Sequence, residues 1–142
     1  MAETTDETDP TAGAVELGRR YLQAFNSGDV ERLDRLYAQD AISVWEPGNP
    51  LTGRARRDSL AAFLALGPRM TAELREAFVT DDTALLVIDW SIEIDAAEDG
   101  GGGTERMAGT GVDVLRLGAD GTWRFVVDNP FGGAGPGAST SE

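Results

Sequence analysis

The chain has 142 residues, a net charge of −13, and no cysteine, histidine or lysine, so all twelve basic residues are arginine. This length suits one domain with a single core. The missing side chains exclude thiolate and imidazole nucleophiles, Schiff-base lysines, and zinc or iron sites of the usual imidazole or thiolate type. The negative charge disfavours nucleic acid and anionic membrane surfaces as partners. Any proton transfer must therefore use Asp, Glu or Tyr.

The two ends of the chain differ in composition from its middle. Residues 1–11 are polar and acidic, and residues 132–142 are mostly small, so neither end has the apolar side chains that would offset the entropy of ordering. We expect disordered tails at 1–11 and 132–142 around one domain at 12–131. The sequence has no apolar run of about 20 residues and no secretion signal, which predicts a cytoplasmic protein.

The first half of the domain has the apolar spacing of helices. Steps of three and four residues predict three helices, at about 14–27, 29–39 and 56–66. Asp29 is a typical N-cap for the second helix, and Gly67 followed by Pro68 is a typical C-terminal stop for the third. Between these helices, residues 42–45 predict a short strand, followed by a turn-rich segment at 47–50.

From residue 70 onward the apolar period changes to two, which predicts strands. These strands lie at 70–79, 84–94, 105–117 and 123–128, with turn signals at 100–103 and at Asp120-Gly121. The order predicts helices first and then a four-stranded antiparallel meander. Because a curved sheet must cover its apolar concave face, we expect the helices to pack there, in an α+β domain.

Four short strings in this order resemble a known superfamily. They occupy residues 21–29, 36–41, 113–116 and 120–124 and read YLQAFNSGD, LYAQDA, DVLR and DGTWR. Together they resemble the cone-shaped α+β barrels that include ketosteroid isomerase, SnoaL-like polyketide cyclases, limonene epoxide hydrolase and nuclear transport factor two, over about residues 13–131. The resemblance implies three N-terminal helices in the concave face of a curved, mainly antiparallel sheet. It implies a small apolar ligand and no cofactor or metal.

The isomerase motif implies three catalytic positions here. Tyr21 falls at the tyrosine of the first helix, and Asp113 falls at the aspartate that binds the substrate oxygen. Glu46 lies beside the position of the base if one inserted residue is allowed, whereas Trp45 is the ungapped match. For Tyr21 the alternative is a structural tyrosine in the core, and for Glu46 it is a solvated loop residue.

Asp113 is a candidate from its neighbours alone. It shares a strand face with apolar or small residues, which disfavour an ionised carboxylate, so its pKa should be raised if that face lines a pocket. The alternative is an exposed edge position, or a pair with Arg116 or Arg124.

The epoxide hydrolase motif implies a second set of acids. Asp89 and Asp128 fall near its two aspartates, but Val87 stands where that enzyme has an arginine, so epoxide opening ranks lower. Asp128 is expected at the cavity mouth. The candidate substrate-binding residues are Trp45, Trp90, Phe25 and Asn129, although a Trp at strand spacing also suits a core or a dimer interface.

Two functions remain open from the sequence. The first is an acid/base isomerase or cyclase that acts on an apolar carbonyl or polyketide-like molecule. The second is a non-catalytic module that binds a ligand or dimerises. In either case the apolar outer face of the meander predicts a homodimer through the sheet.

Overall fold

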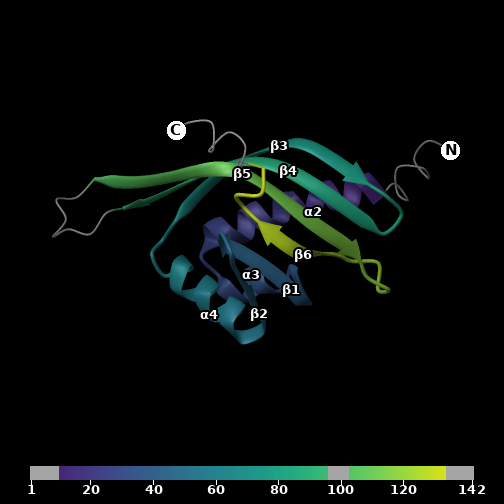
Figure 1. The fold of residues 1–142 in the computed structure, drawn as a ribbon, viewed down its shortest axis with the longest axis horizontal. Coiled ribbons are helices and arrows are strands. Elements are labelled where there is room, and N and C mark those ends of the chain that lie inside the picture. The colour runs from purple at the N-terminus through teal and green to yellow at the C-terminus, as the bar shows by residue number, and fades with distance from the viewer. Residues whose placement is uncertain (1–9, 96–102, 134–142) are drawn as a thin grey trace.

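The computed structural model describes residues 10–95 and 103–133, which form a curved six-stranded sheet with three helices. Helix α2 lies along the inner side of the long strands β3, β4 and β5, while α4 lies beside β1 and β2 and α3 contacts α2 and α4 (Figure 1). The helices span α2 Pro10–Ser27, α3 Val30–Asp34 and α4 Gly53–Leu64. The strands span β1 Tyr37–Glu46, β2 Asn49–Thr52, β3 Arg69–Val79, β4 Thr83–Asp95, β5 Thr104–Leu117 and β6 Trp123–Asn129.

The sheet contains the predicted meander and two further strands. Its order is β2-β1-β6-β5-β4-β3, and every neighbouring pair is antiparallel except β1 with β6. The meander β3 to β6 is therefore confirmed. The segment at 47–50 was predicted only as a turn, but β2 begins at Asn49 and pairs back onto β1, with Gly48 in the left-handed region at φ 81°.

The second helix is shorter than its apolar pattern predicts. The Asp29 side chain caps it by accepting the Arg32 backbone N–H at 3.2 Å, as expected. The helix then ends at Asp34, and the prediction that it runs to about Gln39 is wrong. The Leu36 carbonyl accepts the Phe125 N–H at 2.9 Å, and Tyr37 begins β1 beside β6. Pairing with a distant strand overrides the local helical spacing.

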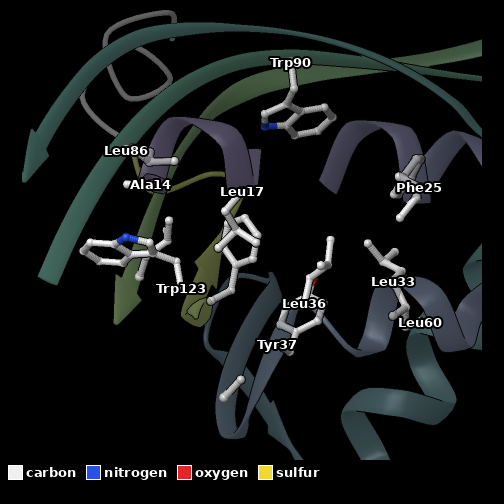
Figure 2. Close-up of a cluster of buried hydrophobic side chains, with 14 of the residues drawn as sticks. Ala14, Leu17, Phe25, Leu33, Leu36, Tyr37, Leu60, Leu86, Trp90 and Trp123 are labelled. Carbon is white, nitrogen blue, oxygen red and sulfur yellow. The ribbon is translucent and has the colours of Figure 1, made fainter. Parts of the chain in front are cut away.

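The core lies between α2 and the concave face of the sheet. Figure 2 shows Trp123 near the same end of this cluster as Ala14 and Leu86, and Phe25 and Leu33 at the other end. The strand alternation explains this burial, because on β4 the residues at even positions from 84 to 94 face the helices. No helix among the described residues is long and apolar enough to span a membrane. The predicted tails, apart from residues at their inner ends, and the turn at 100–103, apart from Gly103, lie outside the described residues.

Two glycines on α2 give matched tests of this packing. A Cβ on Gly13 would lie 2.8 Å from the buried Trp123 indole, whereas a Cβ on Gly18 would lie 3.7 Å from the Leu86 side chain. Gly18→Ala should raise the free energy of unfolding by about 0.5–1 kcal/mol through helix propensity. Gly13→Ala should lower it by about 1–3 kcal/mol through overpacking. Urea denaturation measures both; equal stability of the two variants would contradict the position of α2 over Trp123.

Candidate functional site

A cavity of about 310 Å³ opens between α2, α4 and the concave face of the sheet. Most of its walls are aromatic or aliphatic. Among the described residues that line it, only Tyr21, Ser59, Asp113 and Asp128 carry a hydroxyl or carboxyl group. An apolar cavity with a few convergent polar groups is the usual form of a small-molecule site.

The two carboxyl groups face each other because the pairing of β5 with β6 contains a register shift. Asp113 lies directly opposite Asp128, and Val114 lies opposite Val127, but Leu115 lies opposite Phe125. One β6 residue, at position 126, is therefore extra, which is a β-bulge. Phe125 faces inward. Without the bulge, strand alternation would therefore turn residue 127 inward and leave the Asp128 side chain on the outer face of the sheet.

Asp128 is the centre of a buried hydrogen-bond network. Its Oδ2 accepts the Tyr37 hydroxyl at 2.6 Å and the Trp45 indole N–H at 2.9 Å. Asp113 and Asp128 also hydrogen-bond to each other, and the Asn129 backbone N–H donates to Asp113 Oδ1 at 3.2 Å.

The environment assigns different protonation states to the two acids. Burial, and next the charge of Asp128, raise the pKa of Asp113 well above its usual range. Burial also raises the pKa of Asp128, but hydrogen bonds from Tyr37, Trp45 and Asp113 and the positive charge of Arg56 oppose this increase. Two adjacent buried carboxyls do not both ionise readily. The pair therefore keeps at least one proton, and this environment favours Asp113 as the acid that donates to Asp128.

Two tyrosines extend this network into the cavity. The Tyr21 and Tyr37 hydroxyls lie 3.2 Å apart, and Tyr21 lines the cavity wall. Burial, and next the charge of Asp128, raise the pKa of both phenols well above the ordinary value, so both stay neutral and can donate. The Arg56 guanidinium lies 4.2 Å from the centre of the Tyr37 ring, on which it stacks.

The structure brings together six of the nine residues proposed from the sequence. Tyr21, Asp113 and Asp128 supply the polar groups of the cavity, and the other three, Trp45, Trp90 and Phe25, contribute to its apolar walls. The alternative pairing of Asp113 with an arginine is wrong, because among the described residues Arg116 binds Asp40 and Arg124 binds Asp120.

The other three candidates lie away from the cavity. Glu46 is exposed at the end of β1, where it accepts Asn49 Nδ2 at 3.2 Å. Asp89 lies on the outer face of β4, bonded to Thr110 Oγ1 at 2.8 Å and 3.5 Å from Arg75 Nε. Asn129 also faces outward, and its backbone N–H alone reaches Asp113. These corrections follow from the strand alternation, which puts adjacent residues on opposite faces.

The sequence analysis missed Tyr37 and Arg56 as parts of the site. Tyr37 belongs to the string at residues 36–41, but the sequence analysis placed that position in the second helix, predicted at 29–39. Arg56 carried no signal, because an arginine early in an amphipathic helix is ordinary. Within the described residues, no group of three or more acidic side chains converges as a metal-ligand set.

Asp113→Asn tests the shared proton. Because folding raises the pKa of Asp113, its protonated form stabilises the fold fully below the ordinary pKa, and this stability is lost as the pH rises through the raised pKa. The free energy of unfolding of the wild type should therefore fall relative to the variant, by about 1.4 kcal/mol per unit of pKa shift. Urea denaturation of both proteins from about pH 5 to about pH 9 measures this difference; a pH-independent difference would contradict the protonated Asp113.

Comparisons with known proteins agree with this fold. A family model of the SnoaL-like domain matches residues 18–126. A Kribbella flavida protein of known structure is 18% identical with a TM-score of 0.75, over 92% of each chain. An NTF2-like family protein from Streptomyces avermitilis is 20% identical with a TM-score of 0.67, over 84% of this chain and 93% of that one. A ketosteroid isomerase-like protein from Erwinia carotovora is 22% identical with a TM-score of 0.64, over the same shares. No curated protein matches the sequence of this chain. Because the family model spans most of the domain, the chain belongs to the SnoaL-like domain family.

Proposed function

We propose that this protein binds a small apolar molecule by its oxygen and moves a proton on it, as an isomerase or cyclase does. The observation that carries the proposal is the Asp113–Asp128 pair, in which a half-buried and a buried carboxyl group face a mostly apolar cavity. Pairs of titratable groups in different protonation states are typical of acid/base sites. The cavity volume of about 310 Å³ suits a ligand of one or two rings.

The proposed chemistry assigns one role to each polar group. The carbonyl oxygen of an apolar or polyketide-like substrate accepts hydrogen bonds from the Tyr21 hydroxyl and from protonated Asp113. As Asp113 turns to the substrate, Asp128 loses one of its donors and becomes a stronger base. Asp128 then takes a proton from the carbon next to the carbonyl, and negative charge develops on the oxygen that Tyr21 and Asp113 hold. Return of the proton to another carbon completes an isomerisation.

A non-catalytic binding module is the second candidate. The observation that favours it is that Asp128 already accepts from Tyr37, Trp45 and Asp113, which weakens it as a base. Epoxide opening is the weaker alternative, because Asp89 lies on the outer face and Val87 stands where the arginine of that mechanism would be.

Exchange of carbon-bound protons separates these functions. The probe is a β,γ-unsaturated cyclic ketone in D₂O, with exchange followed by NMR and conjugation followed by ultraviolet absorbance. Asp128→Asn should reduce the rate by about a hundredfold or more, because it removes the base. Asp113→Asn should reduce it by about tenfold or more, because an amide still donates but is a weaker acid.

The matched control is Asp89→Asn, which removes an acid from the outer face of the sheet and should keep the wild-type rate. Equal rates for all four proteins would contradict the proposed roles of Asp113 and Asp128. Quenching of tryptophan fluorescence by the ketone without any exchange would support the binding module instead.

We also propose a homodimer through the outer face of the sheet. A row of apolar residues crosses five strands in register there, Ile42, Val127, Val114, Leu85 and Phe78. Phe78 is 58% exposed and Ile42 is 37% exposed. A second copy of the row would cover this apolar surface.

Phe78→Asp should convert the dimer to a monomer, because the interface would bury an unpaired charge. Light scattering across a dilution series measures the mass. Leu66→Asp is the matched control, since Leu66 is 59% exposed, lies after α4 and should not affect the dimer. A wild-type monomer at all concentrations would contradict the proposal.

A further inference from the structure

A second pocket is lined by Tyr37, whose hydroxyl donates to Asp128 in the apolar cavity. It is an open hollow of about 730 Å³ that α3, α4, β1 and the turn between β5 and β6 enclose. Five of the twelve arginines of the chain line it, namely Arg35, Arg56, Arg57, Arg116 and Arg124. We call this hollow the arginine pocket. Only two carboxylates are among its lining residues, in a chain whose net charge is −13.

Arg56 is the feature that points to a ligand. Its side chain is buried, with the residue only 3% exposed, and Nη2 binds Asp34 Oδ1 at 2.6 Å. Within the described residues, Nε and Nη1 have no hydrogen-bond partner. Arg56 lines the arginine pocket. Buried donors on a charged group are nearly always paired, so its two unpaired nitrogens indicate that this guanidinium lacks an acceptor beside the pocket.

The other arginines leave further donors available to the same acceptor. Arg116 binds Asp40 at 3.0 Å and Arg124 binds Asp120 at 2.9 Å, and both pairs are partly exposed and therefore weak. No ion pair joins Arg35 or Arg57 to a carboxylate in the part of the chain that the structure describes. The positive charges thus exceed what the neighbouring acids neutralise.

We propose that the arginine pocket binds a phosphate group. A phosphate offers several acceptor oxygens and up to two negative charges, which matches guanidinium groups that approach from several elements. The overall negative charge argues against a nucleic-acid backbone as the source, because a long polyanion would meet the acidic surface around the pocket. The source is therefore free phosphate or a small phosphate monoester. This proposal does not depend on the proposed function of the apolar cavity.

Tyr37 links the arginine pocket to the acid pair of the apolar cavity. Arg56 stacks on the Tyr37 ring at 4.2 Å, and the Tyr37 hydroxyl donates to Asp128 at 2.6 Å. The charge of Arg56 helps to lower the pKa of Asp128, so a bound phosphate would offset that charge and raise the pKa of Asp128 further. If the proposed function holds, phosphate would then change the pH dependence of the acid pair.

Isothermal titration calorimetry with inorganic phosphate tests the proposal on the full chain, with ionic strength held constant by chloride. The wild type should bind with a saturable isotherm. Arg57→Gln should weaken binding by about tenfold, the effect of one lost hydrogen bond to a charged group. Arg54→Gln is the matched control, because Arg54 is an exposed arginine on the same helix that does not line the pocket. It should bind as the wild type does.

The outcomes distinguish a specific phosphate site from nonspecific electrostatic attraction of phosphate. Absence of saturable binding by the wild type would overturn the proposal, as would equal weakening in Arg57→Gln and Arg54→Gln. Tighter binding of glycerol phosphate than of inorganic phosphate would identify a monoester as the source, and equal or weaker binding would identify free phosphate. Arg54 and Arg57 are both exposed, so neither substitution should affect folding, and a change in binding can be assigned to the lost side chain. Calorimetry measures phosphate binding without any catalytic readout, so its result does not depend on whether the apolar cavity is catalytic.

Discussion

Two adjacent carboxyl groups, the buried Asp128 and the half-buried Asp113, constrain the rest of the site. An ionised carboxylate in an apolar surrounding is unstable unless donors or a positive charge stabilise it, and a second ionised carboxylate beside it is less stable still. The protein meets this constraint for Asp128 with Tyr37, Trp45 and Arg56. Asp113 keeps its proton. The network thus keeps a proton on the acid pair at the wall of a mostly apolar cavity.

The backbone makes this arrangement possible at one position. A bulge in β6 changes the side on which its last residues face, and Asp128 turns from the outer face to the concave face opposite Asp113. The parallel pairing of β1 with β6 then brings Tyr37 and Trp45 to the same carboxylate. Irregular strand pairing near functional groups is common because it redirects a single side chain while the sheet stays intact.

Tyr37 and Arg56 connect the two hollows of the molecule. On one side the Tyr37 hydroxyl holds Asp128, and on the other its ring face carries the Arg56 guanidinium. Five of the twelve arginines line the arginine pocket, although the chain as a whole has a large excess of acidic residues. The positive charge of Arg56 therefore acts on Asp128, because both side chains are buried and interact through a medium of low dielectric constant.

The amino-acid sequence by itself determined the chemistry that is open to this protein and most of its fold. Because the side chains include no imidazole, thiol or amine, acid/base chemistry must use carboxyl and phenol groups. The change in the period of apolar residues from 3.6 to 2 predicted the helices and the meander. The same periodicity placed Tyr37 in a helix, and the resemblance to the isomerase and epoxide hydrolase motifs made Glu46 and Asp89 candidates. Only the tertiary structure decided which acids face inward, because one extra residue in β6 reverses the side on which Asp128 lies, and strand pairing over long distances sets that register.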